Sequence, residues 1–179
     1  MNLNKLRDEA YSIAKANGWH EEEHSDEHYL MLVITEIAEA VQADRKNLHA
    51  DVEAFKKYEE IIDFKENFER QIKNTVEDEL SDVVIRCLDF AGLRGIKINI
   101  PQYSFESKSN GKFWMSFTKL CYILCSRLTS NALLYGKIIS VFCMICNYCK
   151  SKGIDLDFFI RIKMNYNRLR GYHHGGKRY

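Results

Sequence analysis

Apolar residues recur at helical spacing along most of the chain. In residues 3–17 they fall on one stripe, as expected for an amphipathic helix with one buried face. Residues 26–46 and 76–93 are apolar around most of the helix circumference, which indicates that these two helices are central in the fold. A loop is predicted over residues 97–112, and three further helical segments follow it, at 113–128, 132–152 and 155–169.

Capping residues support these helix boundaries. Ser25 is a good N-cap for the helix over 26–46, where Asp26 and Glu27 place negative charge in the first turn. Thr75, followed three residues later by Asp78, resembles a capping box at the start of the next central helix. One proline and nine glycines are few chain breakers for an all-β sandwich or barrel. The sequence therefore predicts an all-α helical bundle.

The chain length of 179 residues corresponds to one domain, residues 1–179. Residues 47–74 are rich in Lys and Glu with scattered aromatic residues, which predicts an extra helical segment, either one exposed helix or two short ones. Residues 171–179 form a polar tail. Because several helices are apolar nearly all round, we expect a homodimer or a higher homo-oligomer.

Net charge and cysteine usage bear on location and partners. The formal net charge is +1, so there is no overall field to attract a nucleic acid polymer or an anionic membrane. The six cysteines follow an N-terminus without a signal-peptide pattern, which predicts reduced thiols in a cytoplasmic protein. Residues 132–149 approach the length of a membrane span, but Lys137 and Asn147 favour a buried bundle helix instead. Cys143, Cys146 and Cys149 lie in the same helical pattern, which favours small buried residues over a metal site.

Two pairs of carboxylates interrupt the predicted central helices. Glu36 and Glu39 are three residues apart on the first, and Glu79 and Asp82 are three apart on the second, so each pair shares a helix face. The face that carries Glu36 and Glu39 is otherwise apolar and is expected to point inward. Burying ionised carboxylates is costly without a cation, so the two pairs predict an oxygen-rich site for Mg²⁺ or Mn²⁺. The alternative is four solvated surface charges.

Further polar residues extend this candidate site. Asp89 returns to the face of Asp82 and is a candidate to orient a metal-bound water, although an ion pair of Arg86 with Asp82 or Asp89 is the alternative. A second candidate face combines two cations and an amide: Lys163, Asn167 and Arg170. This face is suited to bind a triphosphate. The alternative is a solvated basic helix end, which the helix dipole favours.

Three histidines recur every four residues, at His20, His24 and His28. A single helix through all three would place them on one face, as in some transition-metal sites. The helix break expected at Ser25 argues against such a site.

At the acidic pairs the sequence resembles the MazG-type, all-α nucleoside triphosphate pyrophosphohydrolases. The family signature is Glu-x-x-Glu, a spacer and Glu-x-x-Asp, and the surrounding residues match as well, over about residues 3–96. The two halves read Glu36-Ile37-Ala38-Glu39 and Glu79-Leu80-Ser81-Asp82. The spacer is longer than the family pattern. Residues 163–170, with the segment 172–177 that contains Lys177, are similar to the C-terminal basic segment of these enzymes.

The resemblance implies hydrolysis of a nucleoside triphosphate to its monophosphate and pyrophosphate, and with it a role in cleaning the nucleotide pool. It implies that Glu36, Glu39, Glu79 and Asp82 hold Mg²⁺ and that the basic face contacts the substrate. A different hypothesis is a catalytically silent helical bundle with an interaction or regulatory role that keeps the acidic site. A di-iron carboxylate bundle would need Glu-x-x-His motifs, which neither central helix offers.

Overall fold

The structure is a computed structural model that describes residues 2–99, 113–128 and 130–176, and the regular secondary structure in these ranges is helical. This confirms the all-α prediction. The predicted loop over 97–112 lies largely outside the described residues. The helices are α1 (Leu3–Ala16), α2 (Asp26–Arg45), α3 (Val52–Lys57), α4 (Phe64–Gln71), α5 (Val76–Leu93), α6 (Phe113–Cys125), α7 (Asn131–Lys152), α8 (Leu156–Arg168) and α9 (His173–Gly176).

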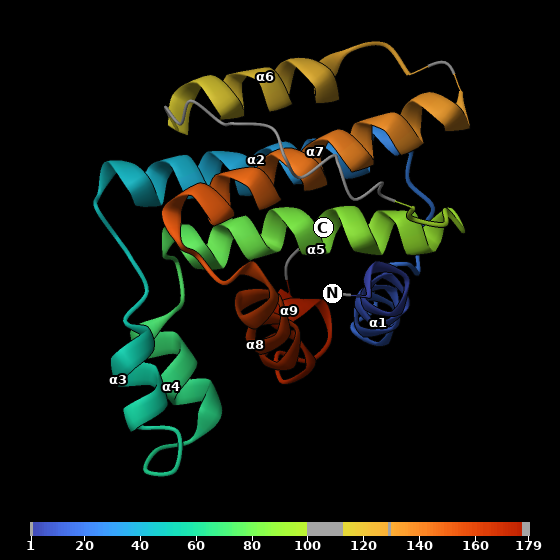
Figure 1. The fold of residues 1–179 in the computed structure, drawn as a ribbon. Helices are drawn as coiled ribbons and strands as arrows, with labels where there is room; N and C mark the ends of the chain where they lie inside the picture. Colours follow the sequence, from blue (N-terminus) through green and yellow to red (C-terminus); the bar gives the residue numbers. More distant parts are fainter. Residues whose placement is uncertain (1, 100–112, 129, 177–179) are drawn as a thin grey trace.

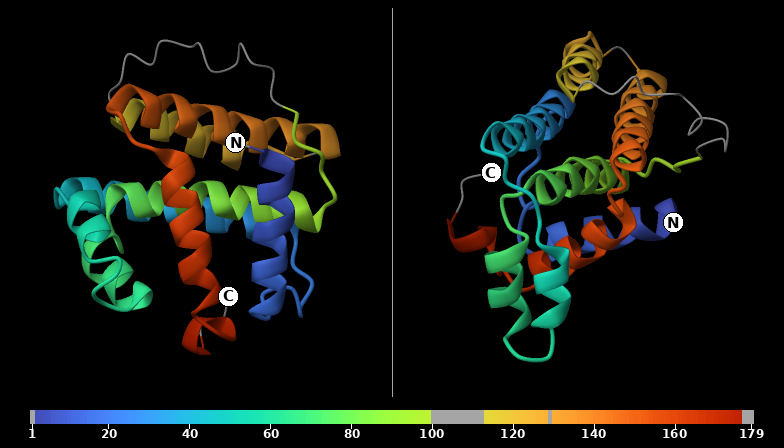
Figure 2. Two further views of the ribbon diagram at one scale, coloured as in Figure 1. Left: turned by 60° about the horizontal axis from the view of Figure 1, so that its bottom comes forward. Right: turned by 60° about the vertical axis from the view of Figure 1, so that its left-hand side comes forward.

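Helix α5 occupies the centre of the fold (Figure 1). It packs against α2 and α7 on one side and against α1 and α8 on the other, and α1 and α8 cross it side by side (Figure 2). The sequence accounts for this position, because apolar residues surround the helix. Those that are buried include Val76, Leu80, Val83, Val84, Cys87, Leu88, Phe90 and Ala91. The polar residues of α5 therefore lie where α1, α2 and α8 meet it.

Helices α6 and α7 form an apolar layer over α2 and α5. The inward face of α7 is buried through Leu134, Ile138, Val141 and Ile145. By length and composition α7 is also apolar enough to cross a membrane, and 44% of its most apolar window is buried. The helix is continuous through the cysteine positions, and burial raises the pKa of the Cys146 and Cys149 thiols to about 12.

Residues 47–74 form two short helices, α3 and α4, which project from the bundle as a hairpin (Figures 1 and 2). Phe55 and Phe68 of this hairpin form a small apolar cluster with Phe159 and Tyr166 of α8. Both ends of the hairpin are fixed to the first turn of α5. Before α3, the Ala50 amide donates to Glu77 at 3.0 Å, and after α4, the Asn74 amide donates to Asp78 at 2.9 Å.

Helices α2 and α5 begin at the N-cap residues that the sequence predicts, Ser25 and Thr75. Ser25 caps α2 by accepting a hydrogen bond from the His28 amide, as predicted. Thr75 caps α5 by accepting from the Asp78 amide, but the Asp78 carboxylate does not complete a capping box at Thr75. Asp78 Oδ2 accepts instead from the Asn74 amide, one residue earlier, and Asp78 Oδ1 accepts from Lys163 of α8.

The polar tail folds back onto the N-terminal region. Gly18, directly after α1, has φ +86°, and a Cβ at this position would lie 2.4 Å from the Tyr172 ring. The close approach therefore requires glycine. The His173 ring stacks on Trp19 with ring centroids 4.9 Å apart. Lys177 lies outside the described residues.

Candidate functional site

The predicted site residues line one pocket of about 150 Å³. Helix α2 contributes the first acidic pair, α5 the second, and α8 with the residues just after it the basic face. The pocket is lined by all seven residues predicted from the sequence as metal ligands or substrate contacts: Glu36, Glu39, Glu79, Asp82, Lys163, Asn167 and Arg170. The packing of α2 and α8 against α5 brings these distant segments together.

The carboxylates form two overlapping groups with the spacing of metal ligands. One oxygen from each of Glu36, Glu39 and Glu79 lies within 4.8 Å of the other two, and the same holds for Asp78, Glu79 and Asp82. Glu79 belongs to both groups and therefore lies at the centre of the acidic site. Hard carboxylate oxygens gathered in this way suit Mg²⁺ or Mn²⁺.

The two members of the first pair differ in burial. Glu36 is 7% exposed, whereas Glu39 is exposed to solvent, so the expectation that both face the interior is wrong for Glu39. Both residues line the pocket, Glu36 from a buried position and Glu39 from an exposed one. In the second pair Glu79 is 5% exposed and Asp82 is half-buried. The interior end of the site therefore holds Glu36 and Glu79.

Burial and nearby negative charge raise the pKa of the two buried glutamates, Glu36 and Glu79. Burial, together with Asp82 and Asp78, raises the pKa of Glu79 to about 9. Burial and Asp82 also raise the pKa of Glu36, while Arg86 opposes the shift. At neutral pH such groups either hold protons or require additional positive charge. A divalent cation supplies that charge, so the donor set fits the predicted metal.

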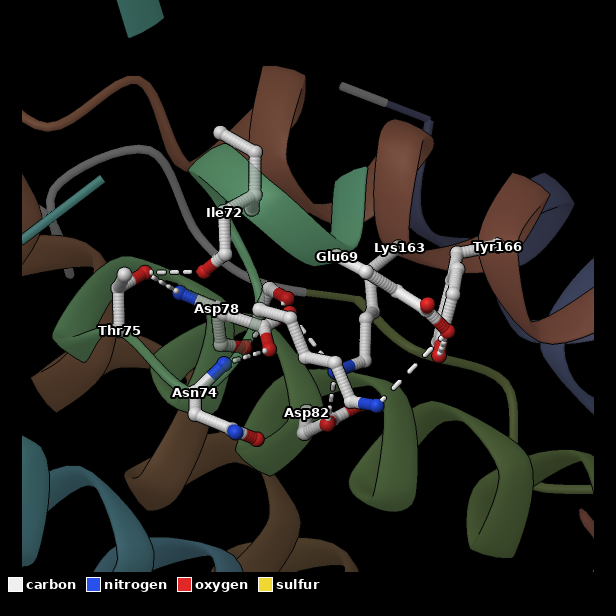
Figure 3. Close-up of polar contacts among 10 residues, drawn as sticks. Glu69, Ile72, Asn74, Thr75, Asp78, Asp82, Lys163 and Tyr166 are labelled. Atoms are coloured by element: carbon white, nitrogen blue, oxygen red, sulfur yellow. Dashed lines mark hydrogen bonds and ion pairs between the residues drawn. The ribbon is translucent and has the colours of Figure 1, made fainter. Parts of the chain in front are cut away.

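Lys163 has different partners from those expected of a phosphate-binding residue. Its Nζ lies 2.7 Å from Asp78 Oδ1 and 2.7 Å from Asp82 Oδ2 (Figure 3). Burial alone would lower the pKa of Lys163, but Asp82 and Asp78 raise it above its ordinary value. The Lys163 ammonium group is thus charged and bound to two carboxylates, and it fixes the orientation of Asp82.

Arg86 and Asp89 also find partners that the sequence did not indicate. Arg86 Nε of α5 donates to Glu36 Oε1 of α2 at 2.9 Å, whereas the alternative that the sequence offered was an ion pair with Asp82 or Asp89 within α5. Asp89 lines the pocket, but its Oδ1 lies 2.7 Å from His20 Nε2. Burial raises the pKa of Asp89, and the hydrogen bond to His20 opposes this shift. One carboxylate oxygen of Asp89 is therefore occupied by His20.

The histidine repeat does not form a single ligand set. His20 pairs with Asp89, whereas the His24 and His28 rings stack on each other with centroids 4.2 Å apart. Helix α2 begins at Asp26, so His20 and His24 precede it, in agreement with the predicted break at Ser25.

Asn167 and Arg170 do face the pocket. The Asn167 Oδ1 atom is buried without a hydrogen-bond partner, while the backbone carbonyl of Asn167 accepts from Asn17 Nδ2 at 3.0 Å. The Arg170 guanidinium lies over the Tyr166 ring, 5.6 Å from its centroid. These two residues, unlike Lys163, keep polar groups at the pocket that are not bound to carboxylates of the described chain.

Sequence reasoning missed two contributors. Asp78 was interpreted as a cap, although its position beside Glu79 was a signal that it shares the acidic environment. Lys73 lines the pocket from the linker between α4 and α5, and it was not singled out because it lies in a segment rich in lysine. Its place depends on the path of the linker, which the local pattern does not specify.

Comparisons with protein-family models, curated proteins and solved structures return no match. The fold and site thus define a helical protein with two acidic clusters that could bind metal.

Proposed function

We propose that this protein is a nucleoside triphosphate pyrophosphohydrolase that depends on Mg²⁺, for which Mn²⁺ can substitute. The observation that carries the proposal is the convergence of Glu36, Glu39, Glu79 and Asp82 in one pocket, with two of them almost fully buried. Such a concentration of anionic groups beside Arg170 suits a metal and a phosphorylated substrate together. The Glu-x-x-Glu and Glu-x-x-Asp spacing supports the same class.

The residues of the chain have distinct roles in this proposal. Glu36, Glu39, Glu79 and Asp82 would hold Mg²⁺, which when bound supplies charge to the phosphate oxygens and lowers the pKa of water. Arg86 orients Glu36, and Lys163 orients Asp82, through the contacts described above. Such pre-positioned ligands reduce the reorganisation required when substrate binds.

The proposed reaction needs no covalent intermediate. A water oxygen forms a bond to the α-phosphorus while the bond from that phosphorus to the bridging oxygen breaks. The products are the nucleoside monophosphate and pyrophosphate. Arg170 would bind phosphate oxygens, because a guanidinium donates in a geometry that matches them.

The test is a panel of nucleoside triphosphates assayed with Mg²⁺, with pyrophosphate and phosphate measured separately. We expect pyrophosphate as the product for at least one substrate, and loss of turnover with a chelator. Glu79→Gln keeps the shape of the side chain but removes its charge, so we expect kcat to fall by at least about 100-fold, or about 2.7 kcal/mol in the barrier.

Glu66→Gln is a matched control, because Glu66 lies on the projecting hairpin with its side chain 49% exposed. This variant should keep the wild-type rate. Phosphate as the sole product, or more than a tenth of the wild-type rate in Glu79→Gln, would contradict the proposal. Magnesium binding without turnover of any triphosphate would favour the catalytically silent bundle.

A further inference from the structure

Four lysine and arginine side chains of the described residues line the pocket, and they are not equally engaged: Lys73, Arg86, Lys163 and Arg170. Arg86 and Lys163 bind carboxylates at 2.9 Å and 2.7 Å. Lys73 has a more distant partner, with its Nζ 3.8 Å from Glu69 Oε1. Arg170 has no ion pair within the described part of the chain. Lys73 and Arg170 are therefore the two cations that remain able to bind an incoming anion.

Both of these cations, like Lys163, lie over the ring of one aromatic residue, Tyr166. Lys73 Nζ lies 5.8 Å, and Arg170 Cζ 5.6 Å, from the centroid of Tyr166. Tyr166 is 2% exposed, stacks on Phe68 and donates its hydroxyl hydrogen to Glu69 at 2.7 Å (Figure 3). The ring is therefore fixed, and it lines the pocket together with Lys73 and Arg170. Their mutual repulsion decreases when an anion binds between them.

The position of Lys73 is set by the linker that ends the α3–α4 hairpin. The next residue, Asn74, has φ +63°, and its amide is fixed by the Asp78 carboxylate. Thr75 then begins the capped first turn of α5. The chain reversal at Asn74 thus places a lysine of the projecting hairpin at a pocket built by the central bundle.

We propose that Lys73, together with Arg170, binds the outer phosphates of a polyphosphate, the part that leaves as pyrophosphate. The hairpin that carries Lys73 then determines a preference for polyphosphates over a single phosphate. Lys73 strengthens binding only of a ligand that is long enough to reach beyond the acidic groups. The choice of ligand class rests on the proposed function. The anion site itself rests on Lys73, Arg170 and Tyr166.

The experiment measures binding of inorganic pyrophosphate and of orthophosphate, each with Mg²⁺, by titration calorimetry. For Lys73→Met we expect at least about tenfold weaker binding of pyrophosphate and less than about threefold change for orthophosphate. Lys73→Arg should restore pyrophosphate binding to within about threefold of wild type, since charge and reach are kept. Mg²⁺ affinity without anion should be the same in all three proteins.

Lys65→Met is the matched control. Lys65 is exposed on α4 and does not line the pocket, but its charge, like that of Lys73, lowers the pKa of Glu69. We expect pyrophosphate binding within about twofold of wild type in Lys65→Met. This result would show that binding depends on the position of Lys73 at the pocket and not only on the total charge of the hairpin. Equal weakening by both variants, unchanged binding in Lys73→Met, or no pyrophosphate binding by the wild type would overturn the inference.

These outcomes separate the inference from the proposed function. If no triphosphate is hydrolysed but Lys73→Met loses pyrophosphate binding selectively, the anion site stands and the proposed reaction fails. If triphosphates are hydrolysed to pyrophosphate but Lys73→Met binds it like the wild type, the reaction stands and the role of Lys73 fails.

Discussion

The pocket between α5 and α8 and the layer formed by α6 and α7 each bury a lysine, but they do so by different means. Lys163 in the pocket and Lys137 in the layer are both 4% exposed. Two carboxylates surround Lys163. Lys137 Nζ instead donates to the Leu124 carbonyl at 3.1 Å and to the Ser126 carbonyl and hydroxyl at 2.7 Å, where α6 ends.

The two buried lysines have different roles. Lys163 balances acidic groups that are held in place for binding, so its removal leaves uncompensated anions. Lys137 satisfies carbonyl groups that have no partner within their own helix, so its removal leaves unpaired dipoles of smaller cost. Consistent with this, acidic partners raise the pKa of Lys163 against the effect of burial, whereas burial lowers the pKa of Lys137.

Lys163→Met should have the largest effect on stability. Removing one partner of a buried ion pair leaves Asp78 and Asp82 without their counter-charge, at a cost of about 3 to 5 kcal/mol. For a domain of this size the melting temperature should fall by about 6 to 20 °C. Arg161→Met on the same helix is the control, because its ion pair with Asp157 is exposed and its loss should barely change the melting temperature. A decrease in the free energy of unfolding of less than about 1 kcal/mol for Lys163→Met would contradict the proposed difference between Lys163 and Lys137.

The pocket should also make stability depend on pH and Mg²⁺. The raised pKa of Glu79, from 4.5 to about 9, means that the folded protein retains a proton that the unfolded chain releases. The free energy of unfolding should therefore fall as pH increases through this interval. Mg²⁺ can replace the proton, so stabilisation by Mg²⁺ should grow as pH rises. At 100 times its Kd it should reach about 2.7 kcal/mol, or about 5 to 11 °C.

Thermal melts from pH 5 to 9, with and without Mg²⁺, measure this effect. A double variant, Glu36→Ala with Glu79→Ala, should lose most of both dependences. An equal Mg²⁺ shift in wild type and double variant would rule out the pocket as the metal site.

Lys137→Met should have the smallest effect of the three. Loss of its hydrogen bonds to the end of α6 should cost about 1 to 3 kcal/mol. Hydrogen exchange should accelerate in α6 and α7, while Mg²⁺ affinity and turnover stay at wild-type values. Lys150→Met, at an exposed position of α7, should leave exchange unchanged. Altered Mg²⁺ binding in Lys137→Met would show that the two regions are coupled.

The helices and the acidic pairs could be predicted from sequence because local signals define them. Periodic apolar residues specify α2 and α5, and spacing places Glu36 beside Glu39 on one face. The partners could not be predicted, because they depend on how distant helices cross. Lys163 meets Asp78 across 85 positions of sequence, and Arg86 meets Glu36 across 50. The oligomeric state, location and activity stay predictions.

The anchoring of the α3–α4 hairpin has a consequence for engineering and for evolution. Its two ends are fixed at Glu77 and Asp78, whereas the turn over residues 58–63 lies at the far tip (Figure 2). Lengthening the chain at the tip leaves both anchors in place, so a peptide tag inserted there need not displace Lys73. The same arrangement lets the tip diverge freely and acquire new contacts while the pocket keeps its geometry.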